Sequence, residues 1–208
     1  MDLVCLDLEG VLIPEMWIMV AEHTGIDELR LTTRDIADYD ELMQHRLGAL
    51  ASHDLRLPQI QQIISSVTPL PGAEEFLHTL RAQGLAVILS DTFREFAAPA
   101  MRRLNHPFLL CNELITEPNG AIVGYRLRQT EGKREAVKAF QSLALKVLAV
   151  GDSFNDIAML GAADAGFLFR PSETVHLAHP DIPRFDTHEE LLRAITELSG
   201  VASRDRDQ

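Results

Sequence analysis

Basic residues are scarce in this chain. Its 208 residues include 19 Lys and Arg against 31 Asp and Glu, for a formal net charge of −12. Nucleic acids and anionic membrane surfaces bind basic protein faces, so this deficit argues against both as partners. An acidic protein that binds a phosphate must supply positive charge locally, through a basic side chain or a metal ion.

Cysteine and long apolar runs are also scarce. The two cysteines, Cys5 and Cys111, lie in strand-like apolar runs, which favours reduced core thiols over a disulfide or a metal site. No apolar run approaches the length of a membrane span, and the first residues lack the basic region of a signal peptide, so we expect a cytoplasmic protein. No glycine-rich fingerprint follows the first apolar run, which disfavours dinucleotide binding.

Three short apolar runs each end in carboxylates or hydroxyls. The runs at 3–6, 85–89 and 147–150 precede the segments Asp7-Leu8-Glu9, Ser90-Asp91-Thr92 and Gly151-Asp152-Ser153-Phe154-Asn155-Asp156. Such runs are typical of buried strands in a parallel sheet, where ligands collect beyond the carboxyl ends of the strands. Together with Lys133 at the start of a predicted helix, these segments predict a site for a phosphate and a divalent cation.

The pattern between these runs predicts the domain organisation. Residues 13–69 show helical spacing without a strong strand run, which indicates a helical cap inserted into an α/β core of residues 1–12 and 70–198. Two cap helices, around Leu42 and around Ile60, are expected to pack on each other. From Pro71 onward helices and strands alternate, which predicts a doubly wound parallel sheet.

Two further segments complete this organisation. Asn119-Gly120 between two apolar runs predicts a small β-hairpin flap at about 113–127. A closing helix is expected at 189–198. The tail at 199–208 alternates Arg and Asp with few apolar residues, and we expect it to be disordered.

The polar motifs resemble those of a known family. The set Asp7-x-Glu9-Gly10-Val11, Ser90, Lys133 and Gly151-Asp152-x-x-Asn155-Asp156 is similar to the four motifs of haloacid dehalogenase-like phosphohydrolases, within them the phosphoserine phosphatase branch. The likeness extends from residue 1 to about residue 197. The family usually has Asp where this chain has Glu9. With Glu9 and the sequence Ser90-Asp91-Thr92, the chain is most similar to bacterial members that both hydrolyse phosphoserine and transfer its phosphoryl group to homoserine.

The resemblance implies a Rossmann-like core and a role for each acid of the first motif. Asp7 is interpreted as the nucleophile, which forms an aspartyl-phosphate. A lone Asp at a strand end more often caps the following turn, but four converging motifs favour the nucleophile. Glu9 is interpreted as the general acid and base that protonates the leaving oxygen and deprotonates the acceptor.

A magnesium ion is the cofactor that the resemblance implies. Its expected ligands are the Asp7 carboxylate, the backbone carbonyl of Glu9 and Asp152, since Mg²⁺ prefers oxygen ligands. Asp156 is expected to orient the water shell of the ion or Lys133.

Two residues are expected on the transferred phosphoryl group. Ser90 would donate its hydroxyl and Lys133 would contribute an ammonium. From the residues alone, Arg128 or Arg134 could replace Lys133, but the family register favours the lysine.

The cap is expected to bind the amino-acid part of the substrate. Glu15 could bind an ammonium, although it lies one residue nearer the nucleophile than is usual in the branch, and Arg46 could bind a carboxylate with two parallel hydrogen bonds. Asn155 is a further candidate for substrate contact. Asp91 stands where the branch usually has Gly, which leaves its contact with substrate open.

The sequence therefore predicts a magnesium-dependent phosphoserine phosphatase that also transfers the phosphoryl group to homoserine. Its partners would be these small molecules, and a homodimer is left open. Two alternatives remain. One is a phosphatase for another small phosphometabolite. The other is a receiver-like module with a phosphorylatable Asp, which the cap disfavours because such modules lack it.

Overall fold

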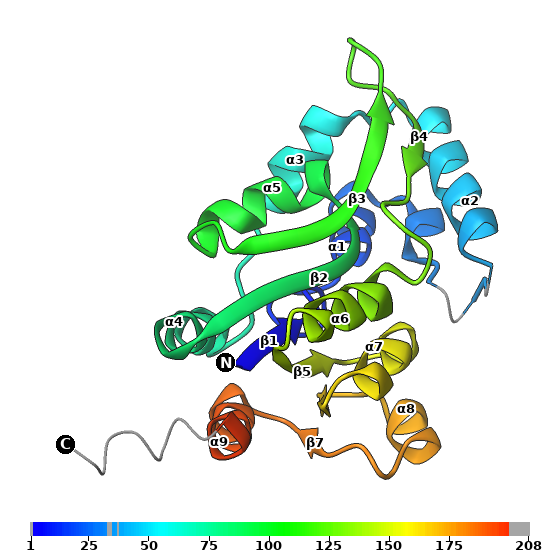
Figure 1. Cartoon of the computed structure of the whole chain (residues 1–208). Helices are drawn as coiled ribbons and strands as arrows, with labels where there is room; N and C mark the ends of the chain where they lie inside the picture. Colours follow the sequence, from blue (N-terminus) through cyan, green and yellow to red (C-terminus); the bar gives the residue numbers. More distant parts are fainter. Residues whose placement is uncertain (1, 33–34, 37, 200–208) are drawn as a thin grey trace.

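The core of the protein is a seven-stranded sheet within the residues that the structure describes, 2–32, 35–36 and 38–199. In the computed structural model the strands lie in the order β4-β3-β2-β1-β5-β6-β7 (Figure 1). Their bounds are β1 Asp2–Leu6, β2 Leu85–Phe93, β3 Phe108–Thr116, β4 Ile122–Arg126, β5 Lys146–Gly151, β6 Ala165–Phe169 and β7 Arg184–Phe185. All neighbours are parallel except β3 and β4. The predicted fold class is confirmed.

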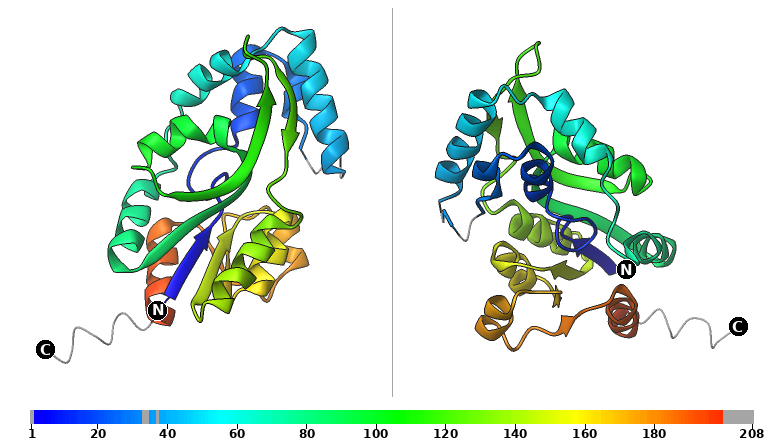
Figure 2. Two further views of the ribbon diagram at one scale, coloured as in Figure 1. Left: turned by 45° about the horizontal axis from the view of Figure 1, so that its top comes forward. Right: turned by 180° about the vertical axis from the view of Figure 1, so that it is seen from behind.

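Helices cover both faces of this sheet (Figure 2). Their bounds are α1 Met16–Thr24, α2 Tyr39–Ser52, α3 Leu57–Ser65, α4 Ala73–Gln83, α5 Arg94–Arg103, α6 Gly132–Ser142, α7 Ile157–Ala162, α8 Glu173–Ala178 and α9 His188–Ser199, with 3₁₀ helices η1 Asp27–Arg30 and η2 Phe154–Asp156. Buried residues of α6, α7 and α8 form one core cluster, and those of α1, α3, α4, α5 and α9 contribute to the other. None of the described helices is long and apolar enough to cross a membrane.

The central strand β1 is apolar along its length because both of its faces are covered. Val4 and Leu6 belong to one core cluster, and Leu3 and Cys5 belong to the other. Successive side chains of a strand point to opposite faces, so a strand between two helical layers reads as a continuous apolar run. Cys5 is a buried free thiol, and burial raises its pKa to about 12.

The segment 13–69 contains α1, η1, α2 and α3, which we call the cap helices. The expectation that its two longer helical patterns pack on each other is wrong. Helix α3 packs mainly against α5 and α1, whereas α2 packs against β4 and η1. The apolar residues of both helices, such as Met43 of α2 and Ile60 of α3, belong to one core cluster that also contains Phe96 of α5, so each helix buries its apolar face without packing on the other. The domain boundaries at 12 and 69 stay a prediction.

The predicted hairpin is present, but it is an extension of the main sheet. The first half of β3 pairs in parallel with β2, and its second half pairs antiparallel with β4. Strand β2 is also longer than predicted and includes Ser90, Asp91 and Thr92. The register between β2 and β3 shifts between Leu89 and Phe93, so this part of β2 is irregular. Sequence analysis did not identify β6, β7 or α8.

The last helix extends slightly beyond its predicted bounds. Helix α9 covers His188–Ser199, so Ser199 is helical, contrary to the predicted tail. The other residues of that predicted tail, 200–208, lie outside the described residues.

Contact between the hairpin tip and α3 makes a testable prediction. Gly120 has φ +85°, and a Cβ added there would lie 2.9 Å from Cδ of Pro58. Gly25 has φ +72°, with nothing within 4 Å of an added Cβ. A positive φ costs an L residue roughly 1–2 kcal/mol, so Gly25→Ala should lose about that much unfolding free energy. Gly120→Ala should lose about 1–3 kcal/mol more, because the rigid proline ring cannot move aside.

Urea unfolding of the two variants and the wild type measures this difference. Equal losses for both variants would show that the hairpin and α3 are not in tight contact.

Candidate active site

The predicted polar segments meet at the carboxyl ends of β1, β2 and β5, which are adjacent strands. Asp7 directly follows β1, and its backbone N–H donates to the carbonyl of Val150 on β5 at 2.9 Å. A pocket of about 320 Å³ opens at this edge of the sheet. Of the residues predicted from the sequence, it is lined by Asp7, Glu9, Glu15, Arg46, Ser90, Asp91, Lys133, Asp152 and Asn155.

Lys133 occupies the centre of the charged end of this pocket. It lies in the first turn of α6, is only 5 % exposed, and contacts three carboxylates. Its Nζ lies 2.8 Å from Asp156, 3.0 Å from Asp7 and 3.3 Å from Asp91. Burial by itself would lower the pKa of Lys133, but Asp156 and Asp7 outweigh this effect, and its pKa lies well above the ordinary value. The ammonium therefore stays charged.

Asp156 lies beneath the pocket and connects Lys133 to the loop after β5. It is fully buried, at 0 % exposure. One carboxylate oxygen accepts from Lys133 at 2.8 Å, and the other accepts the backbone N–H groups of Asp152 at 3.0 Å and Ser153 at 3.2 Å. In this position Asp156 can orient Lys133, which is one of the two roles predicted for it.

Asp7, Asp152 and Asp156 form a compact group of acids. One oxygen from each lies within 4.8 Å of the others. Burial raises the pKa of Asp7 well above its usual value, and burial raises that of Asp152 to about 7, with Asp156 adding to both shifts. Lys133 alone does not offset this concentration of negative charge.

This group fits a divalent cation with oxygen ligands. Both oxygens of Asp156 already accept hydrogen bonds within the protein, so Asp7 and Asp152 are the better ligands. A Cβ on Gly10 would lie 2.4 Å from Cγ of Asp152, so glycine allows the backbone after Glu9 to approach that carboxylate. The side chain of Glu9 is outside the acid group among the described residues, as expected for a residue predicted to bind through its carbonyl.

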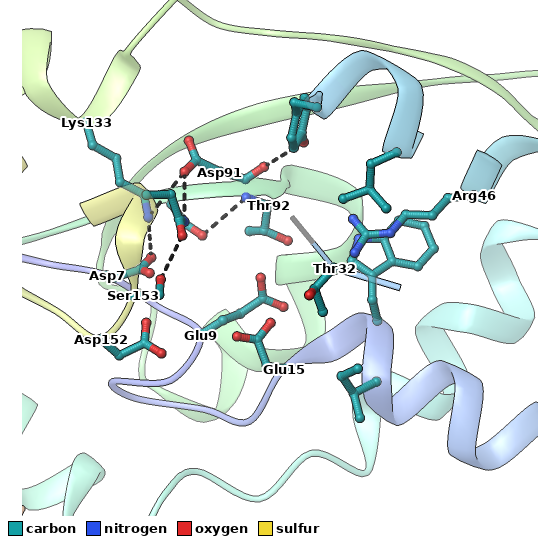
Figure 3. Close-up of a pocket in the computed structure, with 16 residues that line it drawn as sticks. Asp7, Glu9, Glu15, Thr32, Arg46, Asp91, Thr92, Lys133, Asp152 and Ser153 are labelled. Atoms are coloured by element: carbon teal, nitrogen blue, oxygen red, sulfur yellow. Dashed lines mark hydrogen bonds and ion pairs between the residues drawn. The ribbon is translucent and has the colours of Figure 1, made fainter. Parts of the chain in front are cut away.

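Glu9 lies in the middle of the pocket, between the acid group and the cap helices (Figure 3). Its Oε1 accepts the backbone N–H of Met16 at 2.8 Å. Burial raises the pKa of Glu9 to about 8, and the neighbouring carboxylate of Glu15 adds to the shift. The raised pKa favours the protonated form of Glu9, the state that a general acid requires.

Arg46 lies at the opposite end of the pocket from Asp7 and Lys133 (Figure 3). It is 7 % exposed, its guanidinium lies 4.6 Å from the ring centroid of Trp17, and one terminal nitrogen donates to the carbonyl of Leu31 at 2.9 Å. Its buried Nε–H has no hydrogen-bond partner in the part of the chain that the structure describes. A buried unpaired donor costs about 1–3 kcal/mol, so an acceptor from a ligand would be favoured there.

The carboxylate of Asp91 contacts Lys133, and both its side chain and its backbone carbonyl accept further hydrogen bonds. Its carboxylate accepts from the amide of Asn155 at 3.4 Å, and its backbone carbonyl accepts from Asn112 at 2.9 Å and from the Tyr39 hydroxyl at 3.4 Å. Its side chain is 44 % exposed. Asp91 therefore adds a third carboxylate to Lys133.

Several residues that line the pocket were not identified from the sequence. They are Trp17, Ile18, Thr32, Tyr39, Leu42, Thr92 and Ser153. Thr92 could have been found, because it lies two residues after Ser90 on the same strand, and such residues share a face. Trp17 and Tyr39 belong to cap helices and carry no motif.

Known proteins are similar to this chain in sequence and in fold. Residues 1–164 match the family described as haloacid dehalogenase-like hydrolase. The chain is 51 % identical over 198 residues to a phosphoserine phosphatase of Pseudomonas syringae pv. tomato, covering 95 % of this chain and 84 % of that protein. It is also 51 % identical over 199 residues to phosphoserine phosphatase ThrH of Pseudomonas aeruginosa, covering 96 % and 97 %.

Solved structures share the fold at lower identity. A crystal structure of phosphoserine phosphatase in apo form superposes with a TM-score of 0.76 at 21 % identity, covering 92 % of this chain and 98 % of that one. The phosphoserine phosphatase of T. onnurineus superposes with a TM-score of 0.68 at 26 % identity, covering 93 % and 94 %.

The ion pairs of Lys133 make a prediction about stability. Lys133→Met keeps the length and apolar stem of the side chain but leaves Asp156 and Asp7 buried without their cation. Breaking a buried pair in this way costs about 3–5 kcal/mol. Lys138→Met, on the same helix, removes an exposed contact with Glu135, which contributes at most about 1 kcal/mol.

Urea unfolding in metal-free buffer compares the two variants. A loss for Lys133→Met no larger than that for Lys138→Met would contradict the assignment of Lys133 as the cation that holds the acid group together.

Proposed function

Because the chain belongs to the haloacid dehalogenase-like hydrolases and is a phosphatase, we propose that it acts on L-phosphoserine with Mg²⁺ and can pass the phosphoryl group to homoserine. One observation carries the proposal. A single pocket has a carboxylate and an ammonium at one end, Asp7 and Lys133, and a buried guanidinium, Arg46, at the other, with the carboxylate of Glu15 beside Glu9 between them (Figure 3). A phosphorylated amino acid carries matching groups at its two ends.

Asp7 is the proposed nucleophile. Its Oδ1 accepts the N–H of Leu8 at 2.7 Å and lies 3.0 Å from the Lys133 ammonium. This leaves Oδ2 as the oxygen that attacks phosphorus. The new bond joins this oxygen to phosphorus as the bond from phosphorus to the serine oxygen breaks, which gives an aspartyl-phosphate and serine.

Lys133 and Ser90 are proposed to bind the phosphoryl oxygens, and positive charge at this position stabilises the transfer. A magnesium ion held by Asp7, Asp152 and the carbonyl of Glu9 would neutralise further charge on the phosphate. The raised pKa values of Asp7 and Asp152, caused first by burial, support this placement, because a cation would favour both ionised forms.

Glu9 is proposed to move the proton. With its pKa raised to about 8 by burial, it enters the reaction protonated and gives the proton to the departing serine oxygen. It then accepts a proton from the hydroxyl that attacks the aspartyl-phosphate. Homoserine is one methylene longer than serine, and Glu is one methylene longer than Asp. We infer that this reach favours deprotonation of a bound alcohol over a free water.

Glu15 and Arg46 are proposed to bind the ammonium and the carboxylate of the amino acid. The unpaired Nε–H of Arg46 supports a carboxylate partner, since a guanidinium can donate two parallel bonds to one carboxylate. The same contacts would hold homoserine after serine leaves. Bound in this way, an alcohol can compete with water through a high effective concentration.

Turnover of phosphoserine tests the proposal directly. The wild type with Mg²⁺ should release phosphate, and added homoserine should yield phosphohomoserine. Asp7→Asn should lose at least about a thousandfold in kcat, because an amide does not attack phosphorus. Asp181→Asn, at an exposed position, should keep wild-type activity.

Three results would contradict parts of the proposal. Retained activity in Asp7→Asn would exclude the covalent mechanism. Faster turnover of a sugar phosphate or of pyridoxal phosphate would assign another substrate. Phosphate release without phosphohomoserine would restrict the enzyme to hydrolysis.

The role of Arg46 makes a separate prediction. Arg46→Lys keeps the charge but loses the paired donors, which should cost about 1.5–3 kcal/mol of binding to a carboxylate. KM for phosphoserine should therefore rise by roughly one to two orders of magnitude. Turnover of a small phosphate ester without the amino-acid group should change little. Equal losses on both substrates would show that Arg46 supports the fold or the phosphate instead.

A further inference from the structure

His188 lies outside every motif of the site and contacts two backbone carbonyls at once. It is the first residue of α9 and is 4 % exposed. Its Nδ1 lies 2.9 Å from the carbonyl oxygen of Pro71, and its Nε2 lies 2.8 Å from that of Val11. These carbonyls are 60 residues apart in the chain.

The two carbonyls belong to the two chain connections of the cap helices. The outgoing connection, residues 7–15, leads from β1 to α1, and the return connection, residues 66–72, leads from α3 to α4. The connections also contact each other directly, since the N–H of Leu70 donates to the carbonyl of Leu12 at 2.9 Å. His188 therefore contacts the backbone both where the chain leaves the core for the cap helices and where it returns.

The ring of His188 is held by packing as well as by these contacts. Its centroid lies 5.1 Å from that of Phe76 on α4 and 4.4 Å from that of Phe169 on β6. Burial lowers the pKa of His188 below its ordinary value; the two carbonyls act in the opposite direction, and Arg170 adds to the lowering. A neutral ring carries one N–H, so it donates to one carbonyl at a time, whereas carbonyl oxygens only accept.

The outgoing connection links the Val11 contact to the reacting groups. It forms a tight turn in which the N–H of Leu12 donates to the carbonyl of Leu8 at 2.9 Å and that of Gly10 donates to Ile13 at 2.8 Å. Asp7 and Glu9 stand at the start of this turn. A displacement of Val11 is therefore transmitted to both carboxylates, whereas a displacement of Pro71 first affects the return connection.

We propose that His188 is a positioning residue that ties both connections of the cap helices to α9 and so sets the distance between Asp7 and the Arg46 end of the pocket. Its two contacts have different consequences. The contact with Val11 positions the nucleophile and Glu9. The contact with Pro71 positions the cap helices and hence the amino-acid end. The second consequence rests on the function proposed above.

Two amide substitutions separate the contacts. The side-chain nitrogen of Gln can occupy the place of Nε2, so His188→Gln keeps a donor toward Val11. The nitrogen of Asn is nearer the backbone, like Nδ1, so His188→Asn keeps a donor toward Pro71. His188→Phe keeps a ring between Phe76 and Phe169 but can donate to neither carbonyl. Ile195→Ala, in the same helix, is the control, since it removes buried volume from α9 and leaves His188 intact.

The first measurement is hydrogen exchange of the Leu70 amide, which reports the contact between the two connections without any substrate. It should exchange at least about tenfold faster in His188→Phe than in the wild type and in Ile195→Ala, each corrected for its global stability. If His188→Phe does not fold, the two amide variants provide the same comparison. Equal exchange in a His188 variant and in Ile195→Ala overturns the proposal.

The second measurement is kcat/KM for phosphoserine and for a small phosphate ester. His188→Gln should lose about 10- to 100-fold on phosphoserine and keep most activity on the ester, whereas His188→Asn should lose on both. If the ratio of kcat/KM for phosphoserine to kcat/KM for the ester is the same in His188→Gln and His188→Asn, the two contacts do not have separate roles. If the wild type does not turn over phosphoserine, the proposed function fails. The exchange of Leu70 and the ester activity then still decide whether His188 positions the connections.

Discussion

The site depends on the ion pairs of one buried ammonium. Lys133 lies in the first turn of α6, Asp7 directly follows β1 and Asp156 ends η2 after β5, so their contacts join three elements that are distant in the chain. A buried pair seldom stabilises a fold more than apolar residues of the same size would, because each charge loses its hydration. The physical value of this arrangement therefore lies in position. Lys133 is held within reach of Asp7, the proposed nucleophile, and Asp156 keeps it there.

The other end of the pocket depends on how the cap helices are attached. Gln61 of α3 donates to the carbonyl of Glu95 at 2.8 Å, Arg56 donates to the carbonyl of Asn119 at 3.2 Å, and Tyr125 of β4 donates to Asp40 of α2. With the two chain connections, these contacts bind the cap helices to α5 and to the hairpin. Among these contacts, the one between Tyr125 and Asp40 joins α2, which carries Arg46, directly to the hairpin.

The sequence predicted the residues that meet at the strand ends better than it predicted packing. A polar residue after a buried strand carries its own explanation, and the parallel sheet brings Asp7, Ser90 and Asp152 to one edge. The amphipathic pattern of α3 shows that one face is buried but not against which partner, so its packing on α5 was missed. His188 could not be found either. A single histidine forms no motif with a recognisable spacing. Its two partners are backbone carbonyls, which every residue has, so their side chains give no signal in the sequence.

The proposed roles of the two acids of the first motif need opposite protonation states, and their surroundings differ accordingly. Glu9 faces Glu15, a like charge that adds to the effect of burial and helps it keep its proton. Asp7 faces Lys133, which favours its ionised form, yet burial still raises its pKa. If Asp7 is the nucleophile, as proposed, its ionised form would be favoured by positive charge beyond Lys133, placed beside Asp7 and Asp152 and away from the Glu9 carboxyl. A cation bound there would favour the ionised form of Asp7 and leave Glu9 protonated. Two carboxyls only two residues apart could then perform different chemistry.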